Sequence, residues 1–286
     1  WEFYLTPDID IAAVGDDTLS TGEAFGMIIT SSGVFRARRI EAGLLKRFPM
    51  EAVFGMHNIP GIPLGEFAVK PGPMMAGYDI FEIKVKGTGG HAAFPQVTND
   101  AIVAAASLVN ALQTVVSRII DPLLPAVLSV TAIQAGTNFN ILPETATING
   151  TVRYFDPDVQ NLIEARLRSI TKQILAAHGC DATVNYERRY PATINSAAEA
   201  EFSAGVLSRI FGNDKVNRNP TPMMGSEDFA FMLGEIPGCY IWAGNGAGKG
   251  SCMIHNPEYD FNDELIPYGA TYWVELVREY LRQDPA

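Results

Sequence analysis

Two histidines in similar surroundings are the residues of this chain best suited to chemistry. His57 follows a short apolar run, 52–54, with the length and composition of a buried strand, and precedes a loop rich in proline and glycine. His255 lies in Met-Ile-His-Asn-Pro, 253–257, so both histidines precede asparagine with proline close behind. Strand ends hold the chemistry of α/β folds, and neutral imidazole ligates transition metals. Loops at strand ends can therefore bring these two rings together, although each ring could instead only bond to backbone in a tight loop.

A third histidine, His91, ends the glycine-rich segment 87–91. Consecutive glycines let backbone amides converge on an anion. The segment is not a phosphate loop, because no Gly-Lys-Ser/Thr follows and no helix starts directly on it. Two interpretations are equally open: a flexible hairpin, and a functional loop that brings His91 to a substrate.

Asn140 and Arg153 fall near opposite ends of a predicted strand pair, 126–135 and 144–153. A guanidinium such as that of Arg153 grips a carboxylate through two parallel hydrogen bonds. A surface ion pair is the commoner arrangement for an arginine in a strand of this kind.

Three further polar residues have plainer explanations. Glu227 and Asp228 stand at a predicted helix start, where the helix dipole accounts for acidic residues. Cys252 stands three residues before His255 but has no Cys-x-x-Cys partner, so we assign it to packing.

Composition predicts a soluble globular protein with a sizeable core. The 286 residues are 47% hydrophobic and 19% charged, which fits one large or two ordinary domains. A net charge of −11 argues against nucleic acid or an anionic membrane as a partner. Three cysteines without paired spacing favour a reducing compartment, so we expect a cytoplasmic protein. We expect neither a signal peptide nor an apolar stretch long enough to span a bilayer.

Periodicity predicts an α/β protein with a self-contained insertion. Residues 1–35 are atypical, since the first basic residue is Arg36. Over 77–190 the order β-α-β-β-α-β is that of a ferredoxin-like sandwich. Its expected elements are a strand at 79–86, a helix at 100–117, strands at 126–135 and 144–153, a helix at 156–178 and a strand at 182–189. The predicted division is 1–76 and 191–286 for an outer α/β domain, with 77–190 inserted.

From about Arg38 to its end, the chain resembles the metal-dependent amidohydrolases that include hippurate hydrolase, bacterial N-acyl-amino-acid deacylases and plant auxin-conjugate hydrolases. These enzymes belong to the wider aminoacylase and zinc-exopeptidase group. The matching motifs, in the family's order, are Ala-Arg-Arg-Ile-Glu-Ala-Gly-Leu-Leu (37–45), Gly-Met-His-Asn-x-Pro (55–60), Gly-x-Gly-Gly-His-Ala-Ala-x-Pro (87–95), Asn-x-x-Pro (140–143), Gly-Thr-Val-Arg (150–153), Gly-x-Glu-Asp-Phe (225–229) and His-Asn-Pro-x-Tyr-Asp-Phe-Asn-Asp (255–263). The resemblance implies a catalytic α/β domain with an inserted satellite domain that pairs two subunits.

The resemblance also implies roles for five residues. His57 and His255 would ligate a centre of two divalent ions, Zn or Mn and possibly Ni or Co. His91 would stabilise the oxyanion of the neighbouring subunit's site, and Asn140 and Arg153 would hold the substrate's carboxylate. The implied function is hydrolysis of the amide bond of N-acyl amino acids, hippurate-like substrates, by metal-activated water in a homodimer formed through residues 77–190.

Two upstream motifs of the family do not occur here. No His-x-Cys-Gly-His-Asp-x-His string is present, and the place of the family's Glu-Glu-Gly falls on Ser-Ser-Gly, 31–33. Two histidines are too few ligands for a two-metal site. One hypothesis is that residues 1–35 are out of register with the ancestral sequence. A second, less favoured hypothesis is that acidic residues within 1–35 replace the missing metal ligands. The alternatives are a catalytically impaired remnant that dimerises and at most binds N-acyl amino acids, and a metallo-dipeptidase or carboxypeptidase.

Overall fold

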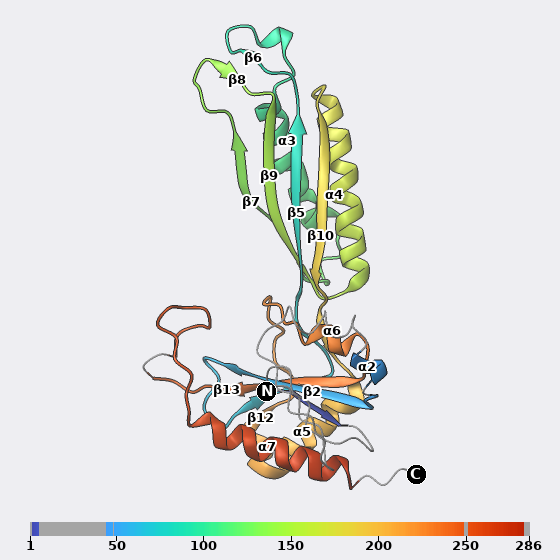
Figure 1. The fold of residues 1–286 in the computed structure, drawn as a ribbon, viewed down its shortest axis with the longest axis vertical. Coiled ribbons are helices and arrows are strands. Elements are labelled where there is room, and N and C mark those ends of the chain that lie inside the picture. Colours follow the sequence, from blue (N-terminus) through green and yellow to red (C-terminus); the bar gives the residue numbers. More distant parts are fainter. Residues whose placement is uncertain (1, 6–43, 48, 249–250, 283–286) are drawn as a thin grey trace. The chain divides into compact units, whose positions relative to one another are not determined.

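The computed structural model describes residues 2–5, 44–47, 49–248 and 251–282, which form two compact units (Figure 1). Unit 1 contains Trp1–Met75, Thr193–Met223 and Glu227–Ala286, and unit 2 contains Ala76–Ala192 and Met224–Ser226. The sequence places its limits at 76/77 and 190/191. That the inserted segment folds and pairs as a domain of its own stays a prediction.

A five-stranded sheet forms the centre of unit 1. Its strand order is β1 (Glu2–Leu5), β2 (Ala52–Ile59), β13 (Gly238–Gly244), β3 (Phe67–Ala68) and β12 (Val216–Asn217). Strands β2 and β13 run parallel, with His57 opposite Trp242. All seven residues of β13 are buried, as expected of a parallel strand covered on both faces.

The two faces of this sheet have separate cores. On one face, side chains such as Phe54 pack with Tyr272 and with residues of the helices α5 (Ala197–Phe211) and α7 (Leu265–Tyr280). On the other, Val53 packs with Phe229 and with the short helix α6 (Ala230–Leu233). Because successive strand residues alternate between faces, His57 follows Val53 onto the face of α6.

Several short elements of unit 1 were not expected from the sequence. These are β3, β12 and a two-stranded sheet made of β4 (Gly72–Met75) and β11 (Thr193–Asn195). Each has only two to four residues, so pairing with a neighbour rather than a repeating pattern defines it. The helical spacing of Ala37, Ile40 and Leu44 predicts a helix at 36–48, of which α2 (Leu44–Arg47) is described. The apolar runs 9–14 and 25–30 could be short strands, and they lie outside the described residues.

Unit 2 is the predicted ferredoxin-like sandwich. Its antiparallel sheet has the order β10 (Asp181–Tyr190), β5 (Gly77–Lys86), β9 (Thr145–Tyr154) and β7 (Ala126–Ala135). The helices α3 (Ala101–Thr114) and α4 (Pro157–Ala177) cover one face (Figure 1). Asp100 caps α3 by accepting a 2.8 Å bond from the N–H of Ile102, and Asp156 caps α4 just before its first-turn proline. The fold class, an α/β protein with this inserted sandwich, is confirmed.

Helix α3 is more apolar than expected. With the π-helical turn η2 (Val115–Ile119) that follows it, it forms a 19-residue stretch, Ala101–Ile119, that is long and apolar enough to span a membrane by length and composition alone. The expectation that no apolar stretch is long enough to span a bilayer was therefore wrong as far as length and composition are concerned. Leu108 and Leu112 of this helix are fully buried in the core of unit 2. A core-facing helix of a two-layer sandwich meets the same criterion.

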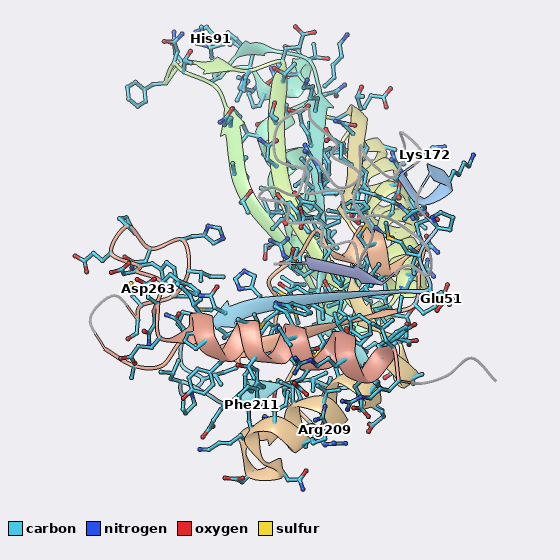
Figure 2. The ribbon with its side chains drawn as sticks, turned by 60° about the horizontal axis from the view of Figure 1, so that its bottom comes forward. Glu51, His91, Lys172, Arg209, Phe211 and Asp263 are labelled. Carbon is cyan, nitrogen blue, oxygen red and sulfur yellow. The ribbon has the colours of Figure 1, made fainter. Side chains whose placement is uncertain are left out.

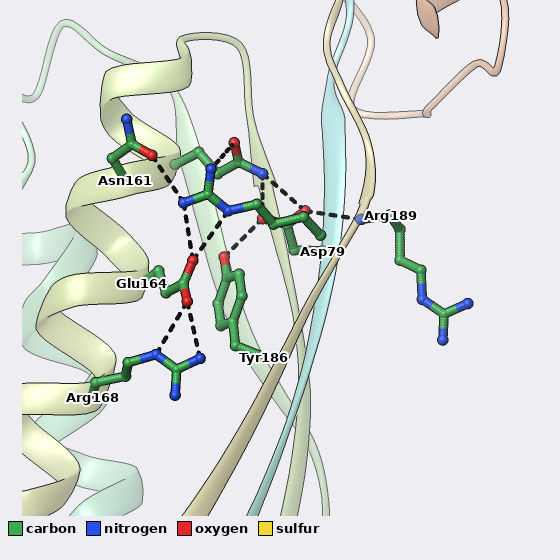
Figure 3. A network of polar contacts seen from close by, with 8 residues as sticks. Asp79, Asn161, Glu164, Arg168, Tyr186 and Arg189 are labelled. Carbon is green, nitrogen blue, oxygen red and sulfur yellow. Dashed lines mark hydrogen bonds and ion pairs between the residues drawn. The ribbon is translucent and has the colours of Figure 1, made fainter. Parts of the chain in front are cut away.

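A buried carboxylate lies inside unit 2 (Figure 3). Asp79 on β5 is 0% exposed. Its oxygens accept bonds from Gln160 Nε2 at 2.8 and 3.1 Å, the Tyr186 hydroxyl at 2.8 Å and the Arg189 backbone N–H at 3.2 Å. Arg188 extends the network by donating to Gln160 Oε1 at 3.3 Å. A buried charge is costly unless it is hydrogen-bonded, and here neutral donors from α4 and β10 surround it. The network therefore joins three elements of the unit.

Candidate functional site

His57 lies near the carboxyl end of β2, as the sequence predicted. Its Nδ1 is 2.7 Å from the carbonyl oxygen of Asn58. A carbonyl oxygen only accepts, so Nδ1 carries the hydrogen and the neutral ring keeps its lone pair on Nε2. A histidine that binds a metal through Nε2 needs this tautomer, and its second nitrogen commonly donates to such a carbonyl.

The segment that carries His255 is fastened to the same edge of the sheet. The side-chain amide of Asn58 donates to the hydroxyl of Tyr259, across 201 positions of sequence. Asn262 donates through Nδ2 to the carbonyl of Asn245 at 3.0 Å, and the N–H of Asn245 donates to the carbonyl of Ile59 at 3.2 Å. The structure thus brings the His57 and His255 motifs together at the ends of β2 and β13.

His255 has an unusual backbone conformation. Its φ of 71° makes it the one non-glycine residue with positive φ in the part of the chain that the structure describes, and its side chain is exposed. A left-handed residue other than glycine costs roughly 1–2 kcal/mol and is often found at functional sites. The surrounding hydrogen bonds hold the loop in this conformation.

Tyr240 and Glu227 lie beside His57 and were not predicted as site residues. The ring of Tyr240 on β13 has its centroid 6.5 Å from that of His57. Its hydroxyl donates to Glu227 Oε2 at 2.5 Å, and Glu227 Oε1 accepts from the N–H of Asp228 at 2.9 Å. Glu227 therefore binds backbone amides at the start of α6, as the dipole interpretation implies, but it also contacts the neighbour of His57. Tyrosine in a buried strand gives no sequence signal for such a role.

The described residues do not complete a metal centre. Within the part of the chain that the structure describes, no three His, Cys, Asp or Glu side chains are close enough to hold an ion together. A structural zinc site uses four ligands, and a catalytic one usually three from the protein. The buried thiol of Cys239 is a poor donor, since burial raises its pKa to about 12. His57 and His255 are thus candidate ligands of a set that is incomplete among the described residues.

Two other predicted residues meet at one end of unit 2. The short strands β6 (Gly90–His91) and β8 (Ile141–Leu142) pair, with His91 opposite Ile141. The N–H of Ala92 donates to the carbonyl of Asn140 at 3.0 Å, which places His91 and Asn140 side by side. Both are exposed, and Figure 2 shows His91 at the free end of this unit. The glycine-rich segment is an ordered hairpin tip.

Arg153 lies at the other end of the same sheet. It stands on β9 opposite Tyr78, and its guanidinium carbon is 4.1 Å from the centre of the Tyr78 ring. It donates to Thr151 Oγ1 at 2.5 Å, and no ion pair links it to a carboxylate among the described residues. Burial lowers the pKa of Arg153, while the charges of Tyr78 and Asp79 oppose that shift. From Thr145 to Arg153 the strand advances about 27 Å at ~3.4 Å per residue. The surface ion pair considered from the sequence is replaced by stacking.

The chain belongs to the peptidase family M20/M25/M40, whose match covers residues 30–279. It is 38% identical to hippurate hydrolase of Campylobacter jejuni over 244 residues, 85% of this chain and 63% of that enzyme. It is 36% identical to N-acetylcysteine deacetylase of Bacillus subtilis over 241 residues, 84% of this chain and 61% of that protein. The first of these relatives is named as a hydrolase and the second as a deacetylase.

Solved structures agree with this assignment. An aminohydrolase structure from methicillin-resistant Staphylococcus aureus matches with a TM-score of 0.78 and 30% identity, over 85% of this chain and 62% of that one. A Bacillus subtilis protein described as a dinuclear metal-binding peptidase of family M20 matches with a TM-score of 0.71 and 29% identity, over 86% and 61%. The likeness supports divalent metal use in the family. The chain spans less than two thirds of each of these relatives.

Proposed function

We propose that this chain is a metal-dependent amidohydrolase that cleaves the amide bond of N-acyl amino acids. The names of two relatives, hippurate hydrolase and N-acetylcysteine deacetylase, specify substrates of this class. The observation that carries the proposal is the hydrogen bond from Asn58 to Tyr259, which fastens the His255 motif to β2, the strand that contains His57. In this proposal His57 and His255 are two ligands of a divalent metal, Zn or Mn.

The chain's other predicted site residues have roles at the substrate. His91 donates a hydrogen bond to the oxyanion that forms at the scissile carbonyl, where a fixed donor stabilises developing charge. Asn140 lies beside it as a second polar contact. Arg153, stacked on Tyr78 with its charge kept by nearby Asp79, grips the carboxylate of the amino acid.

One substrate cannot contact all three residues of a single chain. About 27 Å of strand separates the end of the sheet that bears His91 and Asn140 from Arg153, which exceeds the length of a hippurate-sized molecule. We therefore propose a homodimer through residues 77–190, in which His91 and Asn140 serve the partner's substrate. Exposed apolar side chains on α3 and on the edge strand β7, Val103 at 50% and Ile133 at 51%, support pairing along that side.

A cytoplasmic location accompanies this proposal. Cys180, Cys239 and Cys252 all lie in the described part of the chain, and none of them is in a disulfide. Free thiols persist in a reducing compartment.

Metal content and turnover test the proposal together. The purified chain is expected to bind divalent metal and to hydrolyse hippurate with Mn²⁺ or Zn²⁺ added. His57→Ala and His255→Ala should each lower both metal content and rate by at least about tenfold, the usual order for a lost ligand contact. His178→Ala, at the end of α4 in unit 2, is the matched control and should change neither.

Each contrary outcome has a definite meaning. Hippurate binding without metal or turnover would identify the impaired remnant and overturn the enzyme proposal. A carboxypeptidase is the second candidate, because the chain is 33% identical to thermostable carboxypeptidase 2 of Saccharolobus solfataricus. Faster cleavage of an unblocked dipeptide than of hippurate would favour it.

A further inference from the structure

Residues 91–94, which begin at the last residue of the glycine-rich segment, form a turn held by three hydrogen bonds. The N–H of Phe94 donates to the carbonyl of His91 at 2.9 Å, and the N–H of Ala92 donates to Asn140 at 3.0 Å. The third bond is unusual, because the N–H of Ala93 donates to the imidazole of His91 itself, with 3.0 Å between the nitrogens. The turn and the side chain at its first position are thus one hydrogen-bonded unit.

The Ala93 bond decides which nitrogen of His91 carries its proton. A backbone N–H can only donate, so Nδ1 must present its lone pair, and the neutral ring carries its hydrogen on Nε2. The two ring nitrogens point in diverging directions, so this Nε2–H points away from the turn. His57 has the opposite arrangement, since its Nδ1 faces a carbonyl oxygen.

Phe94 fixes the plane of the His91 ring. The two ring centroids are 5.5 Å apart with an interplanar angle of 61°, an edge-to-face contact that is favourable between aromatic rings. Phe94 is 55% exposed although it is large and apolar. Its ring is therefore largely outside the core and lies edge-to-face with the His91 ring.

The preceding glycines make the turn possible. A Cβ on Gly90 would lie 2.6 Å from Thr98 Cγ2, and one on Gly89 would lie 3.1 Å from the carbonyl oxygen of Leu142. The backbone of this segment therefore packs against its neighbours more closely than other residues allow. Such packing holds the hairpin that ends at His91.

We infer that the turn 91–94 is a positioning device that presents His91 as a fixed Nε2–H donor, with Phe94 as its positioning residue. The hydrogen-bonded turn selects the tautomer and the Phe94 ring selects the orientation. The use of this donor at an oxyanion rests on the proposed function, whereas the tautomer and the orientation do not.

Nuclear magnetic resonance of the full chain tests the tautomer without any activity. Long-range proton–nitrogen correlations of labelled histidines at about pH 9, above the usual imidazole pKa of ~6.5, show which nitrogen is protonated. His91 should show a protonated Nε2 and an unprotonated Nδ1. Ala93→Pro removes the donor, and losing one such bond of about 1 kcal/mol should lower the Nε2–H to Nδ1–H ratio about fivefold. His178 is the internal reference, and its ratio should stay constant.

A second variant covers the case in which proline disturbs the hairpin. Phe94→Leu keeps an apolar side chain but removes the ring, so ring-current shifts on the His91 protons should disappear. A protonated Nδ1 in the wild type, or His91 proton shifts unchanged by Phe94→Leu, would overturn the inference.

Kinetics connect the turn to catalysis. Phe94→Leu should lower kcat about tenfold with KM unchanged, because a loosened donor loses transition-state contact while the substrate's binding contacts remain. Phe94→Tyr should restore the rate, and Val97→Ala, an exposed neighbour in the same loop, should not alter it. An equal loss of kcat in Phe94→Leu and Val97→Ala would show that Phe94 only supports the loop structure and does not position His91. A wild type without turnover would refute the proposed function, while the magnetic resonance results would still decide the turn.

Discussion

At the scale of single residues, the backbone partner of each histidine ring decides which ring nitrogen carries the hydrogen in His57 and in His91. His57 donates from Nδ1 to a carbonyl, so its Nε2 lone pair can ligate a metal. His91 accepts at Nδ1 from an amide, so its Nε2 can donate to an anion. Backbone partners thus hold the same side chain in two different tautomers. These contacts are also the smallest features that can be tested by substitution.

The hydroxyl of Tyr259 should hold the His255 loop. Tyr259→Phe removes the acceptor for the Asn58 amide and should lower the free energy of unfolding by about 1 kcal/mol. Hydrogen exchange should accelerate in residues 251–262 and stay unchanged elsewhere in unit 1. Tyr268→Phe, on α7, is the matched control. Equal exchange rates in the two variants would show that the Asn58 bond does not fasten the loop.

At the scale of elements, a buried polar group adds to the apolar core in joining a strand to its neighbours. Asp79 on β5 receives donors from α4 and from β10, so removing one donor affects all three elements. Burial raises the pKa of Tyr186, and the charge of Asp79 raises it further, so its hydroxyl remains a donor at any ordinary pH. The same unit contains a matched comparison, since the Tyr154 hydroxyl donates to the neutral carbonyl of Tyr190 at 3.2 Å.

Substituting these two tyrosines should give unequal losses. Tyr186→Phe removes a hydrogen bond to a charged acceptor and should cost about 2 kcal/mol, whereas Tyr154→Phe removes a bond to a neutral acceptor and should cost about 1 kcal/mol. Urea unfolding of both variants measures the difference. Equal or reversed losses would mean that Asp79 is not charged in the folded chain.

The thiol of Cys239 on β13 should make unit 1 less stable in alkali. Burial raises its pKa from 9.0 to about 12, with a smaller opposing effect of the Ser203 hydrogen bond. Because the folded pKa lies above the unfolded one, folding favours the protonated thiol. This stability is fully present below pH 9 and is lost as the pH rises towards 12.

Comparison with Cys239→Ala isolates this effect from other titrating groups. The difference in unfolding free energy between wild type and variant should be constant up to about pH 8.5 and should then fall at higher pH. If the difference in unfolding free energy stays constant up to pH 11, the buried thiol of Cys239 does not cause the loss of stability in alkali. Iodoacetamide should modify Cys252, the partly exposed thiol, before Cys239.

At the scale of the whole molecule, the length of the unit 2 sheet demands a second chain if the proposed roles are right. Mixing His57→Ala with His91→Ala should restore hippurate hydrolysis that neither variant has alone. A mixed dimer would combine an intact His57 from one chain with an intact His91 from the other. Recovery to about a quarter of the wild-type rate is expected if subunits exchange freely, since one site in four is complete. No recovery, with exchange shown by labelled subunits, would place His91 at its own chain's site.

Sequence patterns determined the regular elements of this protein. Alternation of Phe81, Ile83 and Val85 with charged neighbours predicted β5, and Asp156 followed by proline predicted the start of α4. The strand order of unit 2 and the family followed from those patterns and from the motifs around His57 and His255. Such signals are local, because strand and helix periods and caps are properties of neighbouring residues.

Tertiary structure decided everything that depends on distant atoms. The two-residue strand β3 exists because it pairs with β13 on one side and with β12 on the other. The bond from Asn58 to Tyr259, the stacking of Arg153 on Tyr78 and the opposite tautomers of His57 and His91 each depend on which donor or acceptor arrives from elsewhere. A sequence states which groups can donate or accept, but only the folded chain brings each one to its partner, since hydrogen bonds depend on distance and direction.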